Sequence, residues 1–144
     1  MNEIRKVVHS ARAFTRGGRE HGVSRSSDGY LDIRLATPDS GRIGTNPEQL
    51  FAAAWSACFE HAIRLAAQGR KITLLPGITI DAEVNLNLAD SGEFLSVGLN
   101  VSIPGVECDV AQALVDEAHE ICPYSKATRG NIDVVIKLVE PDSR

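Results

Sequence analysis

The sequence has few aromatic residues, no excess of basic residues and no long apolar run. Aromatic residues make up 5% of the 144 residues, and 15 Lys and Arg against 19 Asp and Glu give a formal net charge of -4. A basic stripe that binds nucleic acid is therefore not expected. The chain also lacks the roughly 20 consecutive apolar residues of a membrane helix and the apolar stretch of a secretory signal. We predict a cytoplasmic protein that binds neither nucleic acid nor membranes.

Cysteine is scarce as well. The three cysteines are too few for a disulfide-stapled scaffold, and cytoplasmic thiols stay reduced at rest, so disulfides there tend to be transient and catalytic. The cysteines and histidines form no close C-x-x-C or H-x-x-x-H pair. We therefore expect no metal site and no bound cofactor.

The composition is that of an ordinary globular domain. Hydrophobic residues account for 43% of the chain and charged residues for 24%, with no repeat or low-complexity linker. A chain of this length buries a core without staples. We predict one domain over residues 1–144.

The apolar periodicity predicts three strands and then a helix in the first half. Residues 3–14 are a weak strand, and residues 23–36 are a hairpin around a primed turn at Asp28-Gly29. Residues 36–44 are a loop. The helix begins with Thr45 as its cap, Pro47 in the first turn and Glu48 closing a capping box, and it runs to about Gln68 before Gly69.

The second half of the sequence predicts a hairpin, a helix and a strand. Alternating apolar residues at 78–88 and 95–103 flank a turn at 90–92. Asp109 caps a helix that runs to about Ile121, where Pro123 stops it, and residues 132–138 alternate as a last strand. The order β-β-β-α-β-β-α-β predicts an α+β fold with two main helices on mainly antiparallel sheet.

Two cysteines, 64 positions apart, indicate redox chemistry. Cys58 shares one face of the predicted helix with Glu48, Phe51 and Trp55, where a free cysteine can equally be a small buried hydrophobe. Cys122 lies at a helix end before proline, in a polar segment where simple packing explains it less well. We interpret the pair as a redox couple on two ordered elements.

The segments GTNPEQLFAAAWSACF and ICPYSKATRGNIDV resemble the two signature segments of the organic hydroperoxide resistance proteins, the Ohr branch of the Ohr/OsmC family. GGRE, SSDGYLDIRLATP and the chain length extend the resemblance over nearly the whole sequence. It implies an OsmC-like fold, an intertwined homodimer and a peroxidase for organic hydroperoxides, regenerated by lipoylated proteins or dihydrolipoamide. By motif, Cys58 corresponds to the peroxidatic cysteine, Cys122 to the resolving cysteine, Glu48 to the active-site glutamate and Arg19 to the active-site arginine.

The sequence departs from the family pattern at two places. Glu60-His61 follow the ACF triplet, where a small or apolar pair is usual, and the loop at residues 38–44 is short and poor in glycine. Neither departure touches the matched catalytic positions. Both bear on the shape of the pocket rim and on substrate preference.

Physical chemistry supports the same roles. A thiol attacks peroxide as the thiolate, so a nearby cation is needed. The guanidinium of Arg19 stays charged, can hydrogen-bond the thiolate and the departing oxygen, and can be held by a carboxylate such as Glu48. Apolar side chains around the thiol would favour bulky organic peroxides, although the same side chains can equally belong to the core: Phe51, Trp55, Phe59, Ile63 and Tyr124.

Other interpretations remain open at this point. Cys108 has no counterpart in the redox motifs, and we assign it no role. A hydrolase that uses Cys58 with a histidine is a weaker interpretation, because the sequence identifies neither a base nor an oxyanion site. A non-catalytic module could bind an apolar ligand while its cysteines sense oxidation.

The helix geometry favours a homodimer. Glu48 and Cys58 are ten residues apart, which is about 15 Å along a helix axis, so they cannot touch directly on one straight helix. If both serve one site, then the long arginine side chain bridges part of the gap, or the helix breaks, or Glu48 comes from the partner chain. Phe51, Trp55 and Phe59 also point in different directions and need cover. We predict an obligate homodimer with active sites at its subunit interface.

Overall fold

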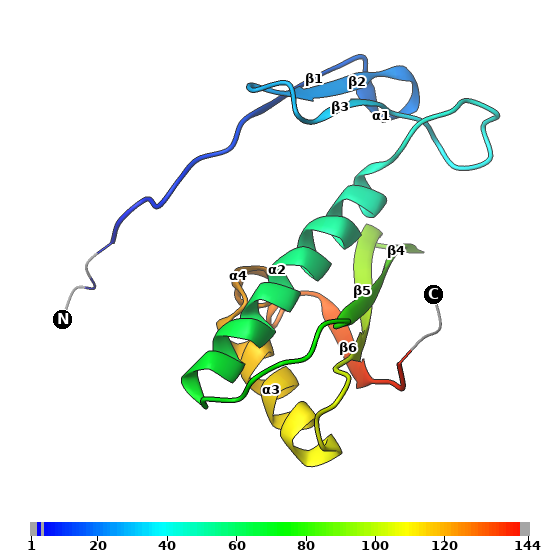
Figure 1. Cartoon of the computed structure of the whole chain (residues 1–144). Coiled ribbons are helices and arrows are strands. Elements are labelled where there is room, and N and C mark those ends of the chain that lie inside the picture. Colours follow the sequence, from blue (N-terminus) through cyan, green and yellow to red (C-terminus); the bar gives the residue numbers. More distant parts are fainter. Residues whose placement is uncertain (1–2, 4, 142–144) are drawn as a thin grey trace. The chain divides into compact units, whose positions relative to one another are not determined.

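The computed structural model describes residues 3 and 5–141. The chain divides into two compact units, Met1–Pro47 and Glu48–Arg144, and each is described by itself (Figure 1). The prediction of a single domain over residues 1–144 stays a prediction.

The N-terminal unit is a small antiparallel sheet in the order β1-β2-β3. Its elements are β1 (Ala13–Arg16), α1 (Gly18–His21), β2 (Val23–Ser26) and β3 (Asp32–Arg34). The one-turn helix α1 was not predicted from the sequence. It fits between β1 and β2 because Gly17 and Gly18 have φ angles of 85° and 77°, which glycine adopts without steric cost.

Two predictions for this unit are wrong in detail. The strand expected over residues 3–14 begins only at Ala13, and the described residues before it form no strand. The turn at Asp28-Gly29 exists, but Gly29 alone has a positive φ, 79°, whereas a type I′ turn needs two such residues. Instead the Asp28 carboxylate accepts hydrogen bonds from Ser26 Oγ at 2.6 Å and from the Tyr30 N–H at 3.0 Å. These bonds hold the pKa of Asp28 below its ordinary value.

The C-terminal unit contains the long helix α2 (Pro47–Gly69). Proline stands at the first helical position, where its missing N–H costs nothing, and Gly69 ends the helix as predicted. The helix thus begins where the sequence predicted, and Thr45 as its cap stays a prediction. The backbone of Thr45 forms an isolated parallel bridge with Leu35.

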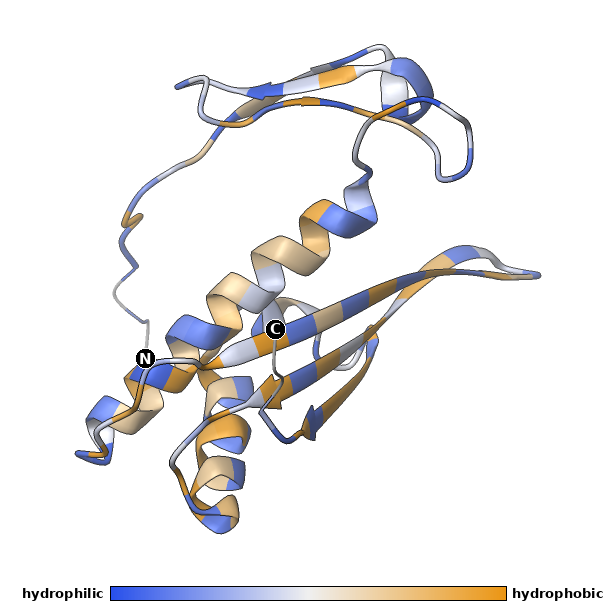
Figure 2. Cartoon of the chain, turned by 45° about the vertical axis from the view of Figure 1, so that its right-hand side comes forward, coloured by the Kyte–Doolittle hydropathy of each residue, from blue (hydrophilic) through white to orange (hydrophobic). Residues whose placement is uncertain are grey.

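A three-stranded sheet in the order β4-β5-β6 completes the unit with two further helices. The strands β4 (Thr79–Ala89) and β5 (Gly92–Ser102) pair antiparallel over their whole length, and β6 (Asp133–Leu138) lies parallel to β5. Figure 2 shows hydrophobic and hydrophilic bands alternating along these strands, which is the pattern of a sheet buried on one face.

The helix α3 (Cys108–Ile121) ends at Ile121, as Pro123 predicted. The same proline also begins a short helix that was not predicted, α4 (Pro123–Thr128). The predicted cap Asp109 lies inside the first turn of α3, because Glu107 occupies the N-cap position.

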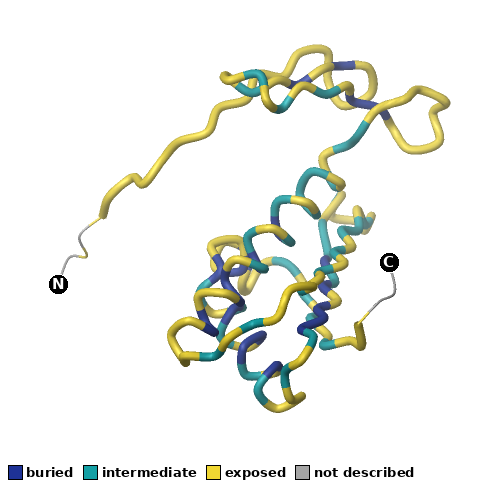
Figure 3. Tube along the Cα trace, viewed as in Figure 1, coloured by how far each residue is buried: buried dark blue, intermediate teal, exposed yellow. Residues whose placement is uncertain are grey.

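The core of this unit lies between the helices and one face of the sheet. Figures 1 and 3 show α2 and α3 on one side of β4–β6, with buried residues along β5 and α3. The largest fully buried apolar side chains come from α2, β5 and α3: Trp55, Phe59, Ile63, Leu99, Val101, Leu114 and Val115. The predicted α+β architecture is confirmed.

Candidate active site

Cys58 and Cys122, far apart in sequence, meet in the C-terminal unit. Cys58 lies on α2 and Cys122 at the junction of α3 and α4. Their sulfur atoms are 3.7 Å apart, with the Cys122 thiol donating to Cys58 Sγ. Both cysteines are free. A disulfide bond is about 2.05 Å long, so the two sulfurs need only a small approach to bond.

The backbone holds Cys122 from both sides. Its N–H donates to the carbonyl of Ala118 at 2.8 Å, and its carbonyl accepts the N–H of Lys126 at 2.9 Å. Cys122 therefore ends α3 and caps α4, with extended dihedral angles, φ -62° and ψ 124°, as the residue before a proline prefers. The turn between the two helices thus fixes this thiol against α2.

The two thiols differ in exposure. Cys122 is 0% exposed, whereas Cys58 is half-buried and Cys108, at the start of α3, is exposed. A dissolved substrate can thus reach Cys58 more readily than Cys122. The geometry favours Cys58 as the attacking thiol and Cys122 as its internal partner.

Burial raises the pKa of the Cys58 thiol, and the neighbouring Cys122 sulfur raises it further. A backbone hydrogen bond from Tyr124 acts in the opposite direction and lowers this pKa. The Tyr124 N–H is available because it lies in the first turn of α4, where amides have no partner within the helix, and Pro123 before it has no N–H. Efficient attack near neutral pH therefore needs a further stabiliser of the thiolate.

Comparison with known proteins identifies the family of this chain. The chain matches the family of OsmC-like proteins over residues 38–137. It is 45% identical to the organic hydroperoxide resistance protein of Xanthomonas axonopodis pv. citri, over 92% of this chain and 96% of that protein. It is 43% identical to the organic hydroperoxide resistance protein OhrA of Bacillus subtilis, over 86% of this chain and 91% of that protein. The crystal structure of the organic hydroperoxide resistance protein OhrB of Bacillus subtilis superposes with a TM-score of 0.86 at 41% identity, covering 92% of this chain and 100% of that chain.

The chain belongs to the Ohr branch of the OsmC-like family. The resemblance stated from the two sequence motifs is thereby confirmed, and so is the OsmC-like fold.

Aromatic side chains from α2 and α4, the helices that carry or begin at the two cysteines, lie close to one another. The Phe51 ring lies 5.5 Å from that of Trp55 and 6.0 Å from that of Tyr124, measured between centroids. Trp55 is fully buried, while Tyr124 is 36% exposed. Trp55 and Phe59 are both fully buried within the core cluster, so their positions suit packing more than contact with a substrate. The predicted substrate-binding roles of these four residues stay predictions.

Ser125 is a residue that the sequence reasoning did not single out. Its side chain is fully buried, and its hydroxyl has no hydrogen-bond partner within the described part of the chain. The sequence feature that could have identified Ser125 is its position three residues after Cys122. This spacing places both residues on the same side of the start of α4. Such a hydroxyl is unusual, because buried polar groups are normally hydrogen-bonded.

Arg19 and Glu48 lie on different units. Arg19 is in α1 of the N-terminal unit, and Glu48 is half-buried in the first turn of α2. On α2, ten residues or about 15 Å of helix axis separate Glu48 from Cys58. The predicted catalytic roles of Arg19 and Glu48 therefore stay predictions.

Neither a metal cluster nor a membrane span is found where the structure is described. Over residues 3 and 5–141, no three His, Cys, Asp or Glu side chains are grouped to hold a metal ion. No helix within these residues has the length and apolar character required to cross a bilayer.

Proposed function

We propose that this protein is a cysteine-based peroxidase that reduces organic hydroperoxides in the cytoplasm and defends the cell against oxidative stress. The observation that carries the proposal is the thiol pair, with sulfurs 3.7 Å apart, one half-buried and one fully buried. The relatives named as organic hydroperoxide resistance proteins support the same substrate class.

In the first step the Cys58 thiolate attacks the terminal oxygen of the hydroperoxide ROOH. The O–O bond breaks, the leaving alkoxide takes up from water the proton that the Cys58 thiol had released, and ROH departs while Cys58 becomes a sulfenic acid. The Tyr124 N–H stabilises the thiolate. We propose that Arg19, held by Glu48, supplies the remaining stabilisation, because burial by itself disfavours the charged thiolate.

In the second step the Cys122 sulfur attacks the Cys58 sulfenic acid. Water leaves, and a Cys58–Cys122 disulfide forms. An external dithiol, dihydrolipoamide or a lipoylated protein, then reduces this disulfide and is itself oxidised to a disulfide. The full cycle converts ROOH and a dithiol to ROH, water and a cyclic disulfide, with no bound cofactor.

The substrate class follows from the surroundings of Cys58. Phe51, Trp55 and Tyr124 form a connected group of rings, and each buried methylene of a substrate contributes about 0.8 kcal/mol. Alkyl and lipid hydroperoxides gain this contribution, and hydrogen peroxide does not.

We also propose the homodimer. Large apolar side chains remain exposed in both units, including Phe14 at 70% and Leu88 at 80%. Monomeric soluble proteins rarely leave wide apolar patches uncovered, so a second copy is a suitable cover. Size-exclusion chromatography with light scattering tests this, with a mass of about twice 15.5 kDa expected and a stable, active monomer contradicting it.

The alternative is a non-catalytic module that binds an apolar ligand or senses oxidation. It would consume peroxide only once for each thiol pair. The test is a steady-state assay with tert-butyl, fatty-acid and hydrogen peroxides, supplied with dihydrolipoamide or with thioredoxin. We expect many turnovers, preference for the organic peroxides and preference for dihydrolipoamide. Consumption that stops after one equivalent would support the alternative.

A further inference from the structure

The α3–α4 corner, residues 119–129, contains a backbone carbonyl that has lost its helical donor. In an α-helix the carbonyl of residue i accepts the N–H of residue i+4, so the carbonyl of His119 would require the N–H of residue 123. That residue is proline, which has no N–H. The carbonyl near the end of α3 therefore needs a donor from another part of the chain.

Arg129 supplies this donor. Its guanidinium Nη2 donates a hydrogen bond to the carbonyl of His119, ten positions earlier in the sequence. The cation also lies at the C-terminal end of α3, where the partial negative charge of the helix dipole favours it. The Arg129 side chain thus makes the bond that Pro123 cannot make.

The pKa of the His119 side chain reflects the same contact. Burial lowers this pKa, and the charge of Arg129 lowers it further, while the carboxylates of Glu120 and Asp116 act in the opposite direction. Among these charges the guanidinium has the largest influence. That order agrees with a guanidinium that contacts the residue itself.

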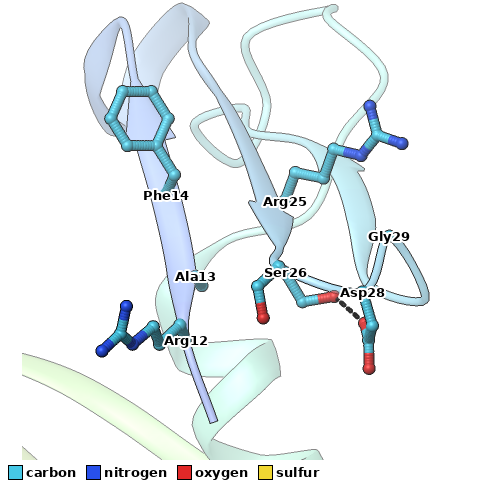
Figure 4. Close-up of a pocket in the computed structure, with 8 residues that line it drawn as sticks. Arg12, Ala13, Phe14, Arg25, Ser26, Asp28 and Gly29 are labelled. Atoms are coloured by element: carbon cyan, nitrogen blue, oxygen red, sulfur yellow. Dashed lines mark hydrogen bonds between the residues drawn. The ribbon is translucent and has the colours of Figure 1, made fainter.

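Exposed arginines of this chain are not all held in this way. Figure 4 shows Arg12 and Arg25 of the N-terminal unit extending away from each other, and the hydrogen bond drawn there joins Ser26 to Asp28. Fixing a long side chain in one conformation costs entropy, so a bond that orders it must offset that cost. The direction of the Arg129 side chain is set by a backbone acceptor on a second helix.

The backbone of Arg129 belongs to the other helix of the corner. Its N–H donates to the carbonyl of Ser125 at 3.0 Å, and Arg129 is the C-cap residue of α4. The Arg129 side chain therefore ties the end of α4 to the end of α3. Cys122 lies within the segment that this contact closes.

The α3–α4 corner carries both groups that act on Cys58. The Cys122 sulfur lies 3.7 Å from the Cys58 sulfur, and the Tyr124 N–H bonds to the same sulfur. A disulfide of about 2.05 Å requires the two sulfurs to approach by roughly 1.7 Å. Misplacement of reacting groups by about 1 Å can cost about a hundredfold in rate. A corner that opened would carry Cys122 away from Cys58.

We propose that Arg129 is a positioning residue for disulfide formation, because it holds the α3–α4 corner where Cys122 can attack the Cys58 sulfenic acid. This inference rests on the proposed function, since it names a residue for the same cycle. In this step the S–S bond forms and the S–O bond of the sulfenic acid breaks, and the proton of the Cys122 thiol leaves with the hydroxide as water. Arg129 acts through the backbone that carries Cys122.

A time course of oxidation tests the proposal. The full-length protein with Cys108→Ser, which removes the exposed third thiol, is mixed with one equivalent of tert-butyl hydroperoxide. Samples are quenched at successive times with a sulfenic-acid trap and an alkylating reagent and are analysed by mass spectrometry. We expect Arg129→Met to lengthen the lifetime of the Cys58 sulfenic acid by about tenfold, while the loss of the Cys58 thiol slows by less than about threefold. Arg129→Lys keeps a charged donor and should recover part of the rate.

Two matched variants separate the bond to His119 from other effects of removing a cation. Lys126→Met removes a cation from an exposed position of α4. Arg70→Met removes another bond between elements of this unit, which Arg70 Nε donates to the Glu117 carboxylate at 3.0 Å. Both variants should keep the wild-type lifetime of the sulfenic acid. An unchanged lifetime in Arg129→Met, or an equal increase in either control, would overturn the proposal.

Urea denaturation of the reduced proteins distinguishes positioning from folding. We expect Arg129→Met and Arg70→Met to have similar midpoints, because each loses one exposed bond of a charged side chain. A much lower midpoint in Arg129→Met, with no recovery in Arg129→Lys, would assign the residue to folding and overturn the proposal.

An equilibrium with glutathione separates this inference from the proposed function. Glutathione disulfide oxidises the Cys58–Cys122 pair and releases two glutathione thiols, so no peroxide is needed. We expect Arg129→Met to lower the equilibrium constant for the protein disulfide by about tenfold, which is about 30 mV. If peroxide forms no Cys58–Cys122 disulfide in the wild type, the proposed function fails, and the glutathione equilibrium still decides the role of Arg129. A constant equal to that of the wild type would overturn that role.

Discussion

The two units of the chain differ in what they bury and in the charge they carry. Within Glu48–Arg144, the helices α2 and α3 and the strand β5 enclose an apolar core that includes Cys122. Within Met1–Pro47, the buried side chains of the described residues are Ser24, Leu35 and Ala36, and the arginines are classed as exposed. A thiol pair needs fixed distances, which a packed core provides. Charged groups that meet substrates and partners need exposure, which the small sheet provides.

The largest expected effect on peroxide reduction comes from replacing the two thiols of the C-terminal unit. We expect Cys58→Ser to abolish peroxide reduction, because the attacking sulfur is lost. Cys122→Ser should still consume one equivalent of peroxide and then stop as the sulfenic acid. Trapping with a dimedone reagent and mass spectrometry would detect that acid.

Cys108→Ser is the matched control for both variants. Cys108 is the exposed third cysteine of the same unit, and its removal should leave turnover unchanged. Peroxide consumption by Cys58→Ser at the wild-type rate would contradict the assignment.

The second largest expected effect comes from removing the charge of Arg19 in the N-terminal unit. We expect Arg19→Ala to slow oxidation of Cys58 by about tenfold or more, as loss of a preorganised charged donor does. Because burial raises the pKa of Cys58, loss of this cation should also displace the rise of the oxidation rate to higher pH. Stopped-flow oxidation across a pH series measures both effects, with Arg34→Ala as the control. An unchanged rate and profile would move the role to Arg12 or Arg16.

Stability should depend on the C-terminal core far more than on the exposed hairpin tip. Leu99 is fully buried in β5, whereas Tyr30 is 94% exposed. We expect Leu99→Ala to lower the free energy of unfolding by about 2–5 kcal/mol, and Tyr30→Ala to change it by less than about 0.5 kcal/mol. Urea denaturation measures both, and a larger loss for Tyr30→Ala would show that the hairpin is covered by a partner.

The smallest expected effect concerns His119 on α3. Burial, and then the charge of Arg129, lower the pKa of His119 below its ordinary value of 6.5. The unfolded chain therefore binds the proton more readily, so this group's contribution to stability is present above about pH 6.5 and is lost as the pH falls below it. His119→Gln should remove part of the loss of stability between pH 7 and pH 5. His61→Gln, on an exposed position of α2, is the control, and an equal change in both variants would contradict the assignment.

Much of the C-terminal unit could be predicted because local signals there agree with tertiary packing. The alternation along β4, β5 and β6, the proline at position 47 and Gly69 each identify an element or its end. The helix α4 was missed because Pro123 both stops one helix and begins another, and the sequence shows only the stop. The strand at residues 3–14 was placed too early, since a short alternating run has no partner to reveal where pairing starts.

The site could be predicted only in part. The motif around Cys122 identifies the residue, but the backbone turn that brings its sulfur to Cys58 is a tertiary property. The aromatic residues show the limit most clearly, because Phe51 and Phe59 look alike in sequence, yet Phe51 contacts Tyr124 and Phe59 lies in the core. Ser125 was passed over because burial of a serine cannot be recognised from its neighbours in sequence.

The most direct test of the redox couple is the identity of the disulfide formed by peroxide. The reduced protein is treated with one equivalent of tert-butyl hydroperoxide, blocked with an alkylating reagent, digested and analysed by mass spectrometry. The 3.7 Å separation of the sulfurs predicts a single disulfide between Cys58 and Cys122, with Cys108 alkylated. A disulfide that includes Cys108, or full alkylation of all three cysteines after the peroxide has been consumed, would contradict the account.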